Sequence, residues 1–161
     1  MSRTACDGLQ QAIASEAQRT LSVLSLLTPG TLGYRAVAHQ RSLGEVAWHM
    51  VQAVGSIASQ LEWDVKGPAK GDPVPEEPSQ IQARYEQVID GLLAHVGLLA
   101  DKELDDEVEF YGQSASRGAA LRILLDHEIH HRGGLVILMR QAGLPPPPIY
   151  GPSGPAPKTP A

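Results

Sequence analysis

The chain has 161 residues, enough for one domain with a sizeable core, and a formal net charge of −5. Its 13 Lys and Arg residues form no cluster, so the basic surface that nucleic-acid binding requires is not expected. No apolar run reaches the roughly 18 residues of a membrane span, no signal-peptide core is present, and one cysteine excludes an internal disulfide, so we expect a cytoplasmic protein without membrane partners.

Four helices are expected, and the first runs from about Thr4 to Leu27. Apolar residues recur along it at steps of three and four, which is the spacing of one helix face. Pro29 and Gly30 then end the helical pattern. The apolar face is formed by Leu9, Ile13, Ala17, Leu21, Leu24 and Leu27.

The second helix begins at Ser42. Ser42 and Glu45 have the capping-box spacing, in which each side chain bonds a free backbone N–H of the first turn. His49 lies beside the buried face of this helix rather than opposite it. The next segment, 67–78, contains four prolines and no apolar periodicity, which predicts a long crossover connection. The buried face is formed by Val46, Met50, Val54, Ile57 and Leu61.

The third helix is predicted to open with a second capping box, Ser79 and Gln82. An acidic segment, 101–109, follows it, and together with Phe110, Tyr111 and Gly112 predicts an irregular connection that can include a short hairpin. The core face of the helix is formed by Ile81, Tyr85, Val88, Leu92, Val96 and Leu99.

The fourth helix is expected from about Ser116 to Ala142, with Gly143 as its cap and the prolines 145–148 forbidding continuation. Four long helices and no strand pattern predict an all-α fold, a four-helix bundle with a long crossover between helices two and three. The domain is expected over 1–150, followed by a low-complexity, disordered tail over 151–161. The core face of the fourth helix is formed by Ala120, Leu124, His127, His131, Leu135 and Leu138.

Histidines are concentrated in the segment 126–134, DHEIHHRGG, which holds three of the six in the chain. His127 and His131 are four residues apart, so on a helix they are neighbours at roughly 5–6 Å between Cβ atoms. Burying two imidazoles without partners would cost several kcal/mol, on the order of the penalty for unpaired polar groups. A metal ion shared with the inward-facing His49 satisfies all three, which favours a metal site over hydrogen-bonded core histidines.

The same segment also spells HExxH, the pattern of zinc proteases in which the glutamate is the general base. Those enzymes require a third ligand, in the common classes a His, Glu or Asp downstream of the motif. No such residue follows His131, and the position of the last histidine in the longer motif HExxHxxGxxH is Ile137. The protease interpretation is therefore not favoured.

Glu128 then needs another role. It is about 100° around the helix from His127, so it can accept a hydrogen bond from a ligand imidazole, act as a general base, or be a solvated charge. His130 is expected to be peripheral. Gly133 and Gly134 each cost up to about 1 kcal/mol in a helix, which predicts either close helix approach or room for substrate.

The segments LGEVAWHM and DHEIHHRGGL resemble the DinB/YfiT-like superfamily of metal-binding four-helix bundles, and the similarity extends over roughly 5–150. By position, the metal-binding triad of that family corresponds to His49, His127 and His131. One departure from the family pattern is Gly134, where the family commonly has Gln after Arg-Gly, and we expect it to affect the substrate or interface details. Arg132 is expected to serve packing or dimer contacts.

The resemblance implies a divalent metal, zinc or nickel, held by three histidines with open positions, as in catalytic sites. It also implies a homodimer and a small-molecule substrate, for which a low-molecular-weight thiol such as bacillithiol or mycothiol is one expectation. A metal-dependent thiol transferase is the first functional hypothesis. A metal-dependent hydrolase, with Glu128 as candidate base, and a non-enzymatic metal-binding stress-response protein remain open.

Overall fold

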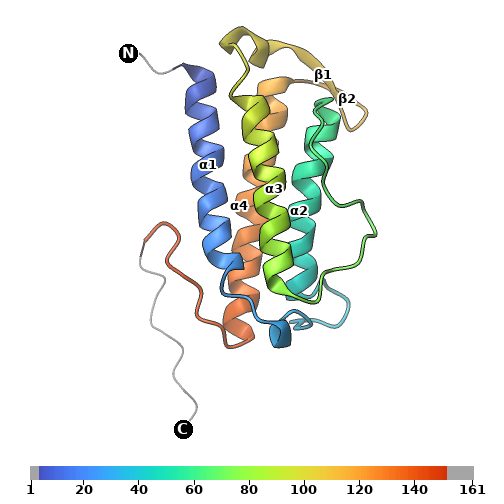
Figure 1. Ribbon diagram of the computed structural model, residues 1–161, viewed down its shortest axis with the longest axis vertical. Coiled ribbons are helices and arrows are strands. Elements are labelled where there is room, and N and C mark those ends of the chain that lie inside the picture. The colour runs from blue at the N-terminus through green and yellow to red at the C-terminus, as the bar shows by residue number, and fades with distance from the viewer. Residues whose placement is uncertain (1–3, 152–161) are drawn as a thin grey trace.

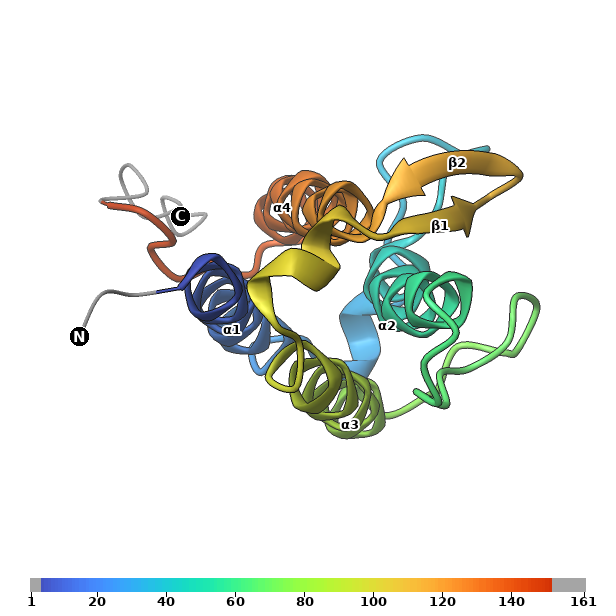
Figure 2. The same ribbon diagram turned by 90° about the horizontal axis from the view of Figure 1, so that it is seen from above.

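The computed structural model describes residues 4–151, and the predicted tail beyond residue 151 lies outside them. Four helices lie side by side around one core (Figure 1). Helix α1 (Ala5–Leu24) packs against α3 (Pro78–Val96) and α4 (Arg117–Gln141). Helix α2 (Leu43–Gln60) packs against the same two helices (Figure 2). No helix within residues 4–151 has the length and apolar character to cross a membrane.

Helix α1 spans Ala5–Leu24 and begins with a capping box between Thr4 and Asp7. It ends one turn before the predicted Leu27. The backbone N–H groups of Leu26 and Leu27 donate to the backbone oxygens of Val23 and Leu24, three residues earlier, which is the hydrogen-bond pattern of a 3-10 helix. A short 3-10 helix, η1, follows at Pro29–Thr31. Both ends of the first helix are therefore explained by local hydrogen bonding.

Helix α2 spans Leu43–Gln60, and the predicted capping box at its start is confirmed. The backbone N–H of Ser42 donates to Glu45 at 2.7 Å, and that of Glu45 donates to the Ser42 hydroxyl at 3.2 Å. The connection that follows packs closely against α2: a Cβ on Gly55 would lie 2.6 Å from the Cα of Gly67. Backbone contacts backbone there, which only two glycines allow.

Helix α3 spans Pro78–Val96, so the predicted capping box of Ser79 and Gln82 is wrong. The first residue of a helix needs no backbone N–H for the helical hydrogen bonds, and proline already has a helical φ. Pro78 is therefore the first helical residue and Glu77 the N-cap. A 3-10 helix, η2 (Asp101–Asp105), and an antiparallel hairpin of β1 (Glu107–Phe110) and β2 (Gln113–Ser116) follow.

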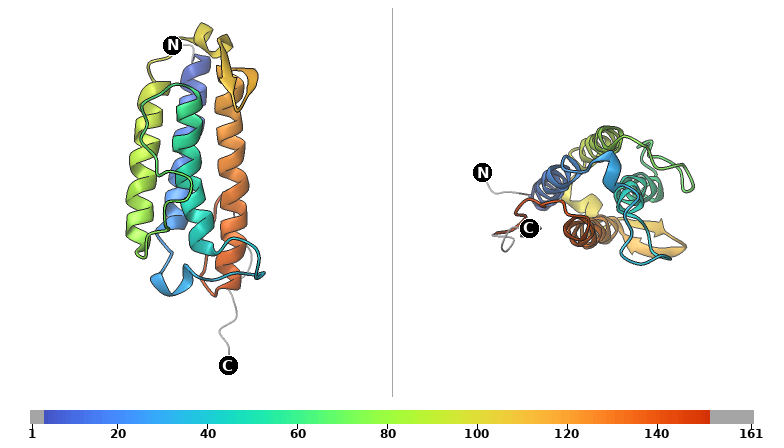
Figure 3. Two further views of the ribbon diagram at one scale, coloured as in Figure 1. Left: turned by 90° about the vertical axis from the view of Figure 1, so that its right-hand side faces the viewer. Right: turned by 90° about the horizontal axis from the view of Figure 1, so that it is seen from below.

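The hairpin turn is formed by Tyr111 and Gly112, which both have positive φ, as a two-residue hairpin turn requires. In Figures 2 and 3 the hairpin and the connection after α2 lie on the side of α2 away from α1.

Helix α4 spans Arg117–Gln141, with Ser116 as its N-cap. Gly143 ends it with a φ of 83°, as predicted.

The core contains most of the predicted apolar residues, but the buried face of α4 differs from the prediction. It passes through Glu128 and Arg132, whose exposed fractions are 4% and 2%. His127 and His131, which were placed on that face, are half-buried at its edge. Five predicted core residues are only partly buried: Leu9, Leu21, Val46, Leu99 and Leu138.

Candidate metal centre

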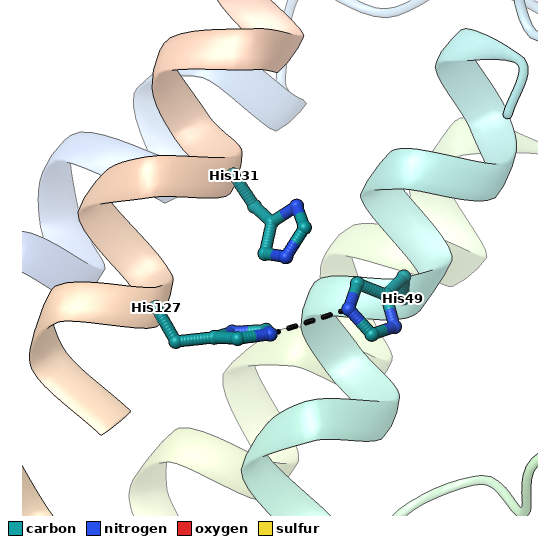
Figure 4. A group of neighbouring side chains, drawn as sticks. All are labelled: His49, His127 and His131. Carbon is teal, nitrogen blue, oxygen red and sulfur yellow. Dashed lines mark hydrogen bonds between the residues drawn. The ribbon is translucent and has the colours of Figure 1, made fainter. Parts of the chain in front are cut away.

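Three histidine side chains from two helices point toward one another between α2 and α4 (Figure 4). His49 comes from α2, and His127 and His131 are one turn apart on α4. One nitrogen from each ring lies within 4.8 Å of the other two. The Nε2 atoms of His49 and His127 are 3.2 Å apart, and the rings of His127 and His131 are separated by 4.2 Å between centroids.

These imidazoles are neutral at pH 7. Burial, with a contribution from the charge of Arg41, lowers the pKa of His49 from 6.5 to about 4. Burial and the neighbouring histidines lower the pKa of His131 to about 4 as well, and burial also lowers the pKa of His127. Neutral imidazoles keep a lone pair free for a metal ion, so the donor set fits a borderline divalent cation such as zinc or nickel.

Glu128 lies on an adjoining face of α4, where its carboxylate contacts α1 and α3 instead of α2. Its Oε1 atom accepts hydrogen bonds from the hydroxyl groups of Thr20 at 2.6 Å and Tyr85 at 2.5 Å. Burial raises the pKa of Glu128 above its ordinary value. The prediction of a solvated charge is wrong, and the two hydroxyl donors replace the expected imidazole partner. The role of general base stays a prediction that this enclosure does not favour.

Arg132 is a core residue that sequence reasoning assigned only to packing or dimer contacts. Its guanidinium donates to the backbone oxygen of Glu16 at 2.9 Å, to the Glu16 carboxylate, and to the hydroxyl of Tyr150 at 2.6 Å. Burial works against the charge of Glu16, but bonds from Tyr150 and Arg132 outweigh it and lower the pKa of Glu16. Together with Glu128, this network fixes the rotation of α4 that turns His127 and His131 toward α2.

Two of the cavities that adjoin the histidine cluster have volumes of about 830 and 520 Å³. The first is bordered by His49 and His127, and the second by His131 and Gly134. A Cβ on Gly133 or Gly134 would meet nothing within 4 Å, so the expected close helix approach is wrong. Gly134 instead leaves room beside the cluster, which was the other expectation.

The tip of the hairpin forms part of the wall of the larger cavity. The hydroxyl of Tyr111 lies 2.8 Å from that of Ser56, and its backbone N–H donates to the Gln60 side chain at 2.9 Å. Arg41 borders both cavities. Sequence reasoning missed Tyr111 and Arg41 as site residues, because neither belongs to a helical pattern that points at the histidines. His130 is exposed beside His131, as expected for a peripheral residue.

Known protein families and structures resemble this chain. A model of the DinB family matches residues 1–160 of the chain. The chain belongs to the DinB family. This confirms the superfamily resemblance that the two histidine-bearing segments indicated.

Two relatives of this DinB-family protein come from Bacillus subtilis. YrdA is 36% identical over 139 residues, which cover 86% of this chain and 83% of YrdA. The crystal structure of the DinB-like protein YjoA superposes on 91% of this chain with a TM-score of 0.70 at 18% identity, covering 99% of YjoA, and shows the same fold.

A DinB-like protein from Bacillus cereus has a crystal structure that is more similar. Its TM-score is 0.86 at 32% identity, with 93% of this chain and 100% of that chain covered. The helices that carry the three histidines therefore belong to a framework that this chain shares with these two DinB-like proteins.

Proposed function

We propose that this DinB-family protein binds one divalent metal ion, zinc or nickel, through His49, His127 and His131. The observation that carries the proposal is the convergence of three neutral imidazole nitrogens within 4.8 Å of one another. Three protein ligands leave coordination positions open, which is typical of catalytic zinc sites, whereas structural sites are closed by four protein ligands. The cluster contains three candidate ligands among residues 4–151, which disfavours a purely structural or stress-response role.

Elemental analysis of the purified protein tests the site directly. We expect about one metal ion per chain in the wild type and a large loss in His49→Ala and His131→Ala. His130→Ala is the matched control, because its ring lies 4.9 Å from that of His131 yet is outside the cluster. Full metal content in both cluster variants would remove the proposed site.

For the reaction, we propose transfer of a low-molecular-weight thiol to an electrophilic small molecule. A divalent metal ion in this position would acidify a thiol or a water molecule that occupies an open coordination position. The cavity of about 830 Å³ beside His49 and His127 has the volume typical of small-molecule sites.

A thiol and a fluorogenic electrophile such as chlorobimane provide the assay. We expect turnover by the metal-loaded protein, none above background after chelation, and recovery when metal is restored. His131→Ala should behave like the chelated protein, and His130→Ala like the wild type. Equal rates with and without metal would reject the transferase proposal.

Metal-dependent hydrolysis is the second candidate, and it needs a proton acceptor near the cluster. Glu128 was the acidic candidate, and its carboxylate is held by Thr20 of α1 and Tyr85 of α3, away from α2 and His49. This arrangement makes hydrolysis the less favoured reaction. Ester hydrolysis that is lost in Glu128→Gln, in a variant that keeps its metal and its fold, would reverse the order.

We further propose that the four helices form a four-helix bundle with a crossover connection. Facing helices of such bundles commonly build metal sites. We also expect two copies to form a homodimer in the cytoplasm, as the family resemblance implies. Sedimentation at several protein concentrations would measure the oligomeric state, and a monomer at every concentration would contradict this part of the proposal.

A further inference from the structure

The larger cavity beside the histidines has walls of one charge. Arg41 precedes α2, and Lys66 and Lys70 belong to the connection after it, and all three line the cavity. No Asp or Glu among residues 4–151 lines it. Acidic residues outnumber basic ones in the chain, 18 against 13, so this separation of charge does not follow from composition.

The three cations are available to a ligand. Arg41, Lys66 and Lys70 are exposed, and none forms a salt bridge or a side-chain hydrogen bond within the described part of the chain. Arg41 lines this cavity together with His49 and His127, so the positive charge of the cavity wall lies beside the cluster.

The cavity wall also has neutral polar and aromatic groups. Gln52 and Ser56 of α2 and Tyr111 of the hairpin line it together with the cations and the histidines. The close contact between Gly55 and Gly67 places the lysine-bearing connection against α2, the helix that carries His49. The volume of about 830 Å³ admits a molecule that spans both.

We propose that this cavity selects small anionic molecules. The carboxylate or phosphate groups of the substrate are held by Arg41, Lys66 and Lys70, while a donor atom of the same molecule reaches the metal ion. This inference deepens the proposed function and rests on it for the second contact. A low-dielectric wall lined by one sign of charge also concentrates anions near the cluster.

Three thiols with the same metal-binding atom but different charge test the selection. The protein is loaded with Co²⁺, and the thiolate-to-cobalt absorption band reports binding of mercaptosuccinate, 2-mercaptoethanol and cysteamine. We expect mercaptosuccinate to bind most tightly and cysteamine most weakly. Raising the salt concentration should weaken mercaptosuccinate selectively, because exposed charges are screened.

Charge-removing variants locate the effect. Arg41→Met, Lys66→Met and Lys70→Met should each weaken mercaptosuccinate about two- to fivefold, the range for exposed ion pairs, and leave 2-mercaptoethanol unchanged. Lys102→Met is the matched control, since Lys102 is exposed on η2 and does not line the cavity. The triple variant should lose the preference for mercaptosuccinate over 2-mercaptoethanol.

The outcomes separate this inference from the metal proposal. If cobalt and 2-mercaptoethanol bind but mercaptosuccinate shows no preference and the variants do not differ, anion selection is overturned while the metal centre stands. If no cobalt binds, calorimetric titration of the metal-free protein with mercaptosuccinate decides: weakening in the three variants but not in Lys102→Met supports anion binding without a metal, and equal affinities reject it.

Discussion

The hydroxyl group of Tyr85 on α3 lies 2.5 Å from Oε1 of Glu128 on α4, in the interior of the helical core. Glu128 follows His127 directly in the sequence, yet the two side chains face different helices. The carboxylate binds α4 to α1 and α3, and the imidazole faces α2. One turn of α4 therefore carries both the polar anchor of the helix and a member of the candidate metal centre.

Removing the Tyr85 hydroxyl should destabilise the protein. In Tyr85→Phe the buried carboxylate loses one of its two hydroxyl donors, and we expect the free energy of unfolding to fall by about 1–3 kcal/mol. Urea unfolding followed by circular dichroism measures it. Tyr34→Phe is the control, because the Tyr34 hydroxyl has no hydrogen bond within residues 4–151. A Tyr85→Phe variant as stable as the control would show that the bond contributes little.

Two glycine substitutions should have opposite effects. Gly55→Ala places a Cβ 2.6 Å from the Cα of Gly67, and backbone must move to admit it, so we expect a loss of about 1–3 kcal/mol. Gly134→Ala meets nothing within 4 Å and removes a flexible residue from a helix interior, which should stabilise by about 0.5–1 kcal/mol. Thermal unfolding of both variants checks the signs, and the same sign in both would contradict the packing described.

The start of α2 should confer a pH-dependent stability. The hydrogen bonds of Arg35 and of the Ser42 backbone lower the pKa of Glu45 below its ordinary 4.5. A carboxyl group of this kind stabilises the folded state above its unfolded pKa, and the contribution is lost as the pH falls through the folded pKa.

Glu45→Gln should therefore be less stable than the wild type at pH 7, and the difference should disappear in the acid range below pH 4.5. Urea unfolding at a series of pH values measures this. Glu109→Gln removes an exposed carboxylate that forms no ion pair within the described residues, and serves as control. A pH-independent difference for Glu45→Gln would exclude the charge as its source.

The segment after α4 should loosen when Tyr150 loses its hydroxyl. That group accepts a hydrogen bond from Arg132 and donates one to Glu16. We expect Tyr150→Phe to increase amide hydrogen exchange at Leu144, Ile149 and Tyr150, because the four prolines between them carry no N–H, and to lower global stability by about 0.5–1.5 kcal/mol. Unchanged exchange in that segment would mean that the hydroxyl does not hold it.

The sequence predicted the helices well where local chemistry decides. The Ser42–Glu45 capping box and the Gly143 cap are set by neighbours in the chain, and both were found. The predicted start of α3 was wrong, because the preference of Pro78 for the first helical position prevails over the four-residue capping pattern that begins at Ser79. Apolar periodicity predicted four helices. It places polar residues on the outer faces of those helices, so the buried Glu128 and Arg132 did not fit the pattern.

The candidate site was predicted only in part, for the same reason. Helical spacing brought His127 and His131 together, and the structure brings His49 to them. The burial of Glu128 was missed, and the packing expected of Arg132 was predicted without its partners, since Thr20, Tyr85 and Glu16 are more than 40 residues away and leave no local pattern. The cations of the cavity wall were missed because they lie in loops, where periodicity carries no information.

The contact between Gly55 and Gly67 has a consequence for how this protein can diverge. It positions the lysine-bearing connection through main-chain atoms alone, so the wall keeps its place whatever side chains it displays. Lys66 and Lys70 can therefore be exchanged for other residues without disturbing α2 or its histidine. The side chains of the cavity wall and the fold therefore depend on different positions of the same segment, and a descendant can change the first while it retains the second.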